Sequence, residues 1–179
     1  MNRSTLLALC VASILTCGIS LPAQATPPAK PFVAGSMQQI VDARKGKPFI
    51  LSLWSLDCVY CPAELKLLSQ LKTKYPKLDI VLIATDTPEQ NAAIAATLDK
   101  HRLRHAESWV FADDFTERLR YEVDRTWHGE LPRAYFYDKS GLAAAVSGQL
   151  KAGEVERWVR QQLDARRTSN QGTPEKSSP

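Results

Sequence analysis

Two cysteines separated by two residues are the clearest chemical signal in this sequence. Cys58 and Cys61 lie in "WSLDCVYCPAE", after an apolar run and before a helical pattern. This spacing lets two thiols form a disulfide with little chain movement, so the pair can open and close in thiol exchange. A structural disulfide would close a very small loop and, in the chain-entropy model, would stabilise the folded state by only about 2 kcal/mol. A zinc site would need about four ligands, and no second cysteine pair of this kind follows. The pattern favours a redox-active pair over these two alternatives.

The N-terminus predicts export. Arg3 is followed by the apolar run "LLALCVASILTCGISL" and then by Ala23-Gln24-Ala25, which has the pattern of a signal-peptidase site. We therefore expect residues 1–25 to be a signal peptide, the mature chain to begin near Thr26, and the protein to be periplasmic.

A lipoprotein signal that ends at Cys17 is the alternative. It is less favoured because Thr16 precedes this cysteine, where a smaller residue is usual. Cleavage near Thr26 would remove two of the four cysteines, Cys10 and Cys17. The mature protein would then contain only the Cys58/Cys61 pair.

Length and composition indicate one soluble globular domain. The chain has 179 residues, of which 44% are hydrophobic and 23% charged, with a formal net charge of +4. Basic residues are not clustered with aromatic ones, so nucleic-acid binding is not expected.

Hydrophobic periodicity predicts an alternation of helices and strands in a domain spanning 36–165. Residues 26–35 are rich in Pro and Ala and predict a linker, and 166–179 lack core-forming residues and predict a disordered tail. Helices are expected at 36–44, 63–75, 88–101, 113–123 and 153–163, and strands at 49–54, 78–86, 133–138 and 142–148, with room for a short strand at 108–111. A β-α-β unit followed by a β-β-α unit implies an α/β fold with a central mixed sheet and helices on both faces.

The order of these elements resembles the thioredoxin fold. A strand leads into W-x-x-x-C-x-x-C at the start of a long helix, and a late Leu131-Pro132 precedes the hairpin. The signal sequence, the helix inserted after the second strand and the ending "LP…FYDKSG" resemble more specifically the exported TlpA/ResA group of thiol–disulfide oxidoreductases. The resemblance covers approximately 33–165.

The resemblance implies roles for the residues around the cysteines. Cys58 corresponds to the exposed nucleophile of the group and Cys61 to the resolving thiol. Pro132 corresponds to the proline that the family holds in the cis form beside the disulfide, which would expose the backbone of Leu131 to an extended substrate segment. Trp54 corresponds to the Trp four residues before the nucleophile.

Two side chains near the cysteines, Trp54 and Glu64, have competing interpretations. Trp54 and Tyr60 would supply apolar contact around the reacting sulfur, although simple core packing is the alternative for Trp54. Glu64 matches an acidic position of the TlpA/ResA group, and it faces the same side of a helix as Cys61, three residues earlier. A partly buried carboxylate there could accept the proton of Cys61; a solvated surface glutamate is the alternative.

Three positions depart from the family pattern. Ser52 stands where thioredoxins carry a buried Asp, the residues between the cysteines are Val59 and Tyr60, and Arg133 follows the late proline where Thr or another small residue is frequent. These departures leave the redox potential and the partner open.

The leading functional expectation is a periplasmic reductant of protein disulfides that acts as a monomer. It would use no cofactor beyond the Cys58–Cys61 disulfide and would need a membrane protein as electron donor. Cytochrome c maturation and copper-centre assembly are the usual client classes of the resembling group. The alternative is a copper chaperone, because two thiolates and the imidazole of His128 would make a soft copper site.

Overall fold

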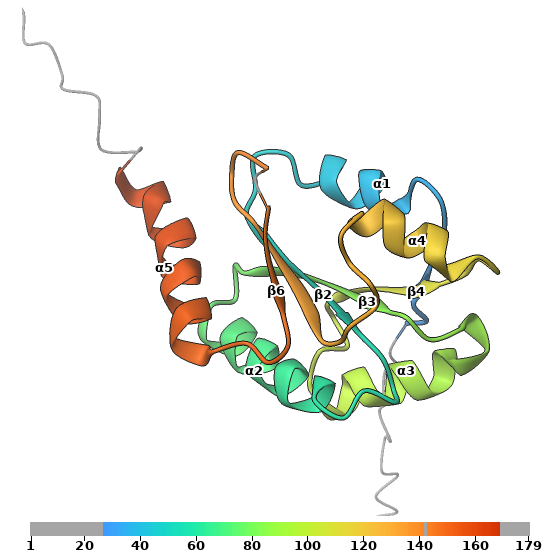
Figure 1. The fold of residues 1–179 in the computed structure, drawn as a ribbon. Helices are drawn as coiled ribbons and strands as arrows, with labels where there is room; N and C mark the ends of the chain where they lie inside the picture. Colours follow the sequence, from blue (N-terminus) through green and yellow to red (C-terminus); the bar gives the residue numbers. More distant parts are fainter. Residues whose placement is uncertain (1–26, 142, 169–179) are drawn as a thin grey trace, which may run out of the picture.

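The continuous apolar run "FILSLW" forms β2 (Phe49–Trp54), a fully buried strand near the middle of a six-stranded sheet (Figure 1). The computed structural model describes residues 27–141 and 143–168. In this part of the chain the strand order is β1-β4-β3-β2-β5-β6. The other strands are β1 (Lys30–Phe32), β3 (Asp79–Ala84), β4 (Glu107–Phe111), β5 (Arg133–Tyr137) and β6 (Ala143–Ser147).

The sheet is mixed, as the sequence predicts. β2 runs parallel to β3 and antiparallel to β5, so it joins the β-α-β unit to the hairpin of β5 and β6. β4 also pairs with β3, which confirms the short strand at "SWVF". Strands buried on both faces carry apolar residues at consecutive positions, which explains the apolar runs of β2, where only Ser52 is polar, and of residues 80–84 in β3.

Helices cover both faces of the sheet (Figure 1). Buried residues of α2, α3 and α5 share one hydrophobic cluster, and those of α1 and α4 share the other. The helices are α1 (Ser36–Asp42), α2 (Cys61–Lys74), the 3-10 turn η1 (Pro88–Gln90), α3 (Asn91–Lys100), α4 (Thr116–Val123) and α5 (Ala152–Thr168).

Local sequence signals account for the helix ends. Leu65, Leu68 and Leu71 bury one side of α2 at helical spacing. Before α3, Thr87 and Gln90 form the reciprocal capping box that the sequence predicts, with Pro88 at the first position of η1.

The expected linker is not wholly a linker. Lys30–Phe32 form β1, which pairs in parallel with β4, and Phe32 is 0% exposed. A strand of three residues is too short to show an alternating pattern beside several prolines, which is why periodicity missed it. At the other end, α5 continues three residues beyond 165. The predicted signal peptide and positions 169–179 of the predicted tail lie outside the described residues.

Candidate active site

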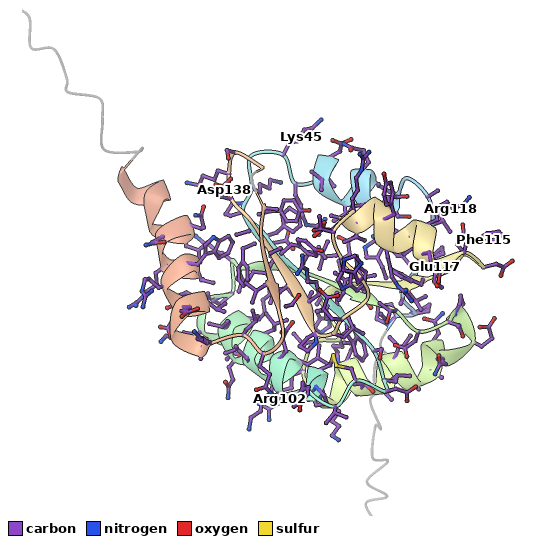
Figure 2. All side chains as sticks on the ribbon, viewed as in Figure 1. Lys45, Arg102, Phe115, Glu117, Arg118 and Asp138 are labelled. Atoms are coloured by element: carbon purple, nitrogen blue, oxygen red, sulfur yellow. A yellow bond between two sulfur atoms is a disulfide. The ribbon has the colours of Figure 1, made fainter. Side chains whose placement is uncertain are left out.

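Cys58 and Cys61 form a disulfide between the end of β2 and the start of α2, with their Cα atoms 5.4 Å apart. The yellow sulfur bond in Figure 2 marks it. Cys61 is the first residue of α2, and Cys58 lies in the turn that joins β2 to α2. The chain leaves β2 at the end of the sheet where the parallel strands finish, and it then enters α2.

The two cysteines differ in access. Cys61 is 1% exposed and belongs to the core cluster, whereas Cys58 is only half-buried. α2 begins at Cys61, two residues before the start expected from the sequence, so Cys61 is in the first turn and Cys58 precedes the helix. The backbone N–H of Cys61 donates to the sulfur of Cys58 at 3.1 Å. In the reduced state, this N–H and the helix dipole would favour negative charge on Cys58.

Glu64 lies buried one turn beyond Cys61, with 3% of its surface exposed. The Ser52 hydroxyl donates to its Oε1 at 2.6 Å, and its Oε2 has no hydrogen-bond partner among the described residues. Burial raises the pKa of Glu64 to about 7, against the opposing effect of the Ser52 hydrogen bond. A carboxyl group with this pKa can take up and release a proton near neutral pH. Its burial excludes the solvated-surface interpretation.

Asp86 holds the loop that precedes Cys58. Both of its carboxylate oxygens accept the backbone N–H of Leu56, at 3.1 Å each, and Thr85 N–H donates to the Trp54 carbonyl at 2.9 Å. Burial raises the pKa of Asp86, and the Leu56 hydrogen bond opposes this. Asp86 was not predicted from the sequence. The signal was available, because an acidic residue just after β3 must lie beside the end of the parallel strand β2.

The two aromatic residues that were predicted to contact a client, Trp54 and Tyr60, differ in their exposure to solvent. Trp54 is 1% exposed and packs in the same cluster as Cys61, so the structure favours the core-packing alternative for this side chain. Tyr60, 59% exposed, and Val59 remain at the surface between the cysteines. Apolar contact with a partner is therefore available from the residues between the cysteines and not from the tryptophan ring.

The Leu131–Pro132 bond is cis, as the resemblance implies. The antiparallel register pairs Leu53 with Arg133, which places Pro132 across from Trp54 at the end of the sheet that carries the disulfide. Leu131 and Cys58 both pack against the core cluster that contains Cys61. The structure thus brings the late proline and the cysteine pair together.

His128 is an exposed residue of the loop before β5. Within 27–141 and 143–168, no group of three or more His, Cys, Asp or Glu side chains is arranged to hold a metal ion. The described structure therefore does not assemble the copper site of the alternative hypothesis.

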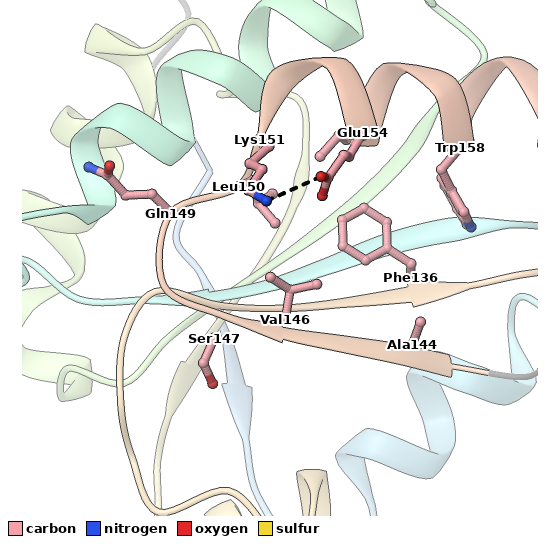
Figure 3. Close-up of a pocket in the computed structure, with 10 residues that line it drawn as sticks. Phe136, Ala144, Val146, Ser147, Gln149, Leu150, Lys151, Glu154 and Trp158 are labelled. Atoms are coloured by element: carbon pink, nitrogen blue, oxygen red, sulfur yellow. Dashed lines mark hydrogen bonds and ion pairs between the residues drawn. The ribbon is translucent and has the colours of Figure 1, made fainter.

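A separate pocket of about 350 Å³ lies between β6 and α5 (Figure 3). Phe136, Val146 and Trp158 supply apolar surface, and an ion pair of 3.3 Å joins Lys151 to Glu154 at the side of α5. None of the predicted site residues lines this pocket.

Curated relatives support the resemblance in sequence. The thiol–disulfide oxidoreductase ResA of Bacillus thuringiensis is 23% identical over 117 residues, which cover 65% of this chain and 64% of the relative. ResA of Bacillus cereus is 26% identical over 117 residues, covering 64% and 63%. The chain thus spans less than two thirds of the length of these relatives. No family model matches the chain.

Solved structures confirm the thioredoxin-like fold. A secreted disulfide oxidoreductase of Mycobacterium tuberculosis, described as homologous to E. coli DsbE, superposes with a TM-score of 0.53 at 24% identity, covering 67% of this chain and 85% of that one. A thioredoxin-family thiol:disulfide interchange protein of Chlorobium tepidum gives a TM-score of 0.54 at 18% identity, covering 80% and 99%. These likenesses establish the α/β fold with its mixed sheet.

Proposed function

We propose that the protein is an exported thiol–disulfide oxidoreductase that reduces disulfides of client proteins. The observation that carries the proposal is the Cys58–Cys61 disulfide at the edge of the sheet, with Cys58 accessible and Cys61 buried over Glu64. The named relatives are thiol–disulfide oxidoreductases, which supports the same chemistry here.

The reaction uses both thiols of the reduced protein. The Cys58 thiolate attacks a client disulfide, forms a mixed disulfide and releases one client thiolate, which takes up a proton. Cys61 loses its proton to Glu64 and attacks the sulfur of Cys58. This step releases the second client thiol and forms the Cys58–Cys61 disulfide. Two electrons pass to the client, so an electron donor must then reduce the pair again.

The predicted export determines where this reaction takes place and where its electrons must come from. A reductant that works outside the cytoplasm needs electrons brought across the membrane, so we propose a membrane protein as donor. Disulfides of cytochrome c maturation or copper-centre assembly are the proposed client classes. No helix in the described part of the chain is long and apolar enough to cross a bilayer.

Trapping of mixed disulfides tests the proposal. Cys61→Ser removes the resolving thiol and leaves the attacking thiol, so we expect this variant to accumulate covalent adducts with proteins of a periplasmic extract. Cys58→Ser is the matched control and should accumulate none. Non-reducing electrophoresis with mass spectrometry reads out both. Equal trapping by the two variants would contradict the assigned roles, and trapping by neither would contradict the proposed activity.

A further inference from the structure

Arg133, the residue that follows Pro132, points its guanidinium at neighbouring side chains. Its side chain is only 12% exposed. Nε donates to the Tyr135 hydroxyl at 3.1 Å and Nη1 to the Ser147 hydroxyl at 2.6 Å. Nη2 donates to Asp124 Oδ2 at 2.8 Å. Each of the three nitrogens therefore has a partner.

These partners fasten the loop between α4 and β5 at both ends. Asp124 directly follows α4, and its other oxygen accepts the backbone N–H of Thr126 at 2.8 Å. Near the other end, Glu130 Oε1 accepts the Ser147 hydroxyl at 3.0 Å and lies 3.9 Å from Arg133 Nη1. Because Ser147 belongs to β6, the guanidinium ties the loop to two strands of the sheet.

The geometry makes this more than a surface ion pair. Exposed pairs contribute little to stability, but the Arg133 and Asp124 side chains are 12% and 19% exposed. Burial alone would raise the pKa of Asp124, but hydrogen bonds from Thr126, Arg133 and Tyr135 hold it below its usual range. The carboxylate is therefore charged at neutral pH, and its bond to Arg133 is charge-assisted.

The fastened loop ends at the segment that would meet a client. Among the described residues, the backbone N–H and carbonyl of Leu131 have no hydrogen-bond partner. Leu131 packs against the same cluster as Cys58, and Pro132 lies across from Trp54 in the sheet register. An extended chain with a disulfide at Cys58 could pair with this free backbone in the manner of strand addition.

We infer that Arg133 is a positioning residue for protein clients: through Asp124, Glu130 and Ser147 it fixes the backbone of Leu131 where an extended client segment pairs. This inference rests on the proposed function, because it requires client disulfides to exchange at Cys58. When the backbone that pairs with a polypeptide is already held in place, less conformational entropy is lost on binding. A small disulfide has no such segment and needs only the sulfur of Cys58, so its reduction should not depend on Arg133.

Two disulfide substrates separate positioning from chemistry. Insulin and the aromatic disulfide 5,5′-dithiobis(2-nitrobenzoate) are reduced by wild type, Arg133→Met and Arg125→Met, with dithiothreitol as electron source for insulin turnover. For Arg133→Met we expect the KM for insulin to rise about tenfold, which corresponds to the loss of one charge-assisted hydrogen bond. The kcat for insulin and the rate of reduction of the aromatic disulfide should stay within about twofold of the wild-type values. Arg125→Met, an exposed arginine of the same loop, should behave as wild type in every assay.

The outcomes are distinguishable. If wild type reduces neither substrate, the proposed function fails. If wild type is active but Arg133→Met keeps its KM for insulin, or loses both substrates equally, the positioning role is overturned. Should thermal melting show that Arg133→Met does not fold, Ser147→Ala removes one partner of the guanidinium without removing charge. We expect the KM of that variant for insulin to be about threefold higher than that of wild type, which corresponds to part of the free energy of one hydrogen bond. An unchanged KM would overturn the inference.

Discussion

At the residue scale, the burial of Glu64 supports its proposed role as the proton acceptor of Cys61. Cys61 is almost fully buried, and a buried thiol loses its proton reluctantly because the charged form is desolvated. The negative charge of Glu64 cannot stabilise a thiolate beside it. The carboxylate can help only by accepting the proton, which its pKa of about 7 permits.

Glu64→Gln should therefore impair resolution and not attack. We expect alkylation of Cys58 by iodoacetamide to stay nearly unchanged, while turnover with a disulfide substrate slows about tenfold or more, as for lost general acid–base catalysis. The pH–rate profile should lose one limb near pH 7. Wild-type turnover from pH 6 to 8 in this variant would remove Glu64 from the mechanism.

The same pKa predicts a pH dependence of stability. In the unfolded chain the pKa of Glu64 is near 4.5, the ordinary value for a glutamate, and in the folded protein burial raises it to about 7. The folded state is thus penalised as pH rises from 4.5 to about 7, and the penalty is constant above that. At about 1.4 kcal/mol per pKa unit, this amounts to roughly 3 kcal/mol.

Glu64→Gln should remove this component, since an amide does not titrate. Urea unfolding of the oxidised protein at pH 5 and pH 8 measures it. The loss of stability between these two values should be smaller in the variant than in wild type by up to roughly 3 kcal/mol. An equal loss in both proteins would contradict the raised pKa.

Residue spacing alone indicated the cysteine pair, whereas Glu64 and Pro132 were indicated by the resemblance to the TlpA/ResA group. The environments of these residues could not be predicted. The hydrogen bond of Ser52 with Glu64 spans 12 positions and depends on how α2 packs against β2. That of Leu56 with Asp86 spans 30 positions and depends on the register of β2 and β3. The burial of Trp54 likewise follows from packing that no local pattern records.

At the scale of elements, β1 is the strand that the sequence pattern did not predict. The helices and the apolar strands repeat a pattern over enough residues to be recognised, but β1 has three residues. Phe32 nevertheless stacks on Phe111 and meets Trp109 edge to face, with ring centroids 5.4 and 6.3 Å away. Tertiary contact and not local pattern therefore decides the structure of this segment.

Phe32→Ala tests whether β1 belongs to the core. Removing a fully buried ring should lower the free energy of unfolding by about 3–5 kcal/mol. Val33→Ala, at the neighbouring position where the side chain is 39% exposed, is the control and should change it by less than about 0.5 kcal/mol. Chemical denaturation measures both. Equal, small effects would mean that the segment behaves as the linker that the sequence predicts.

At the scale of the whole molecule, the sheet edge brings three distant segments to one place. The cysteines follow β2, Asp86 follows β3, and Leu131-Pro132 precedes the antiparallel β5. Parallel strands end at the same edge where the antiparallel strand begins, so the topology assembles the site. The resemblance implied that Pro132 lies beside the cysteines, whereas the place of Asp86 and the fastening of the late loop by Arg133 were not predicted from the sequence.

The reduction potential of the Cys58–Cys61 pair is the most direct test of the central claim that this disulfide is redox-active. The mature protein is equilibrated in glutathione and dithiothreitol buffers of known potential, quenched in acid, alkylated and analysed by mass spectrometry. We predict one two-electron transition within about −270 to −120 mV, the span of disulfide exchange proteins of this fold. A pair that stays oxidised to below about −300 mV, as structural disulfides typically do, would contradict the account.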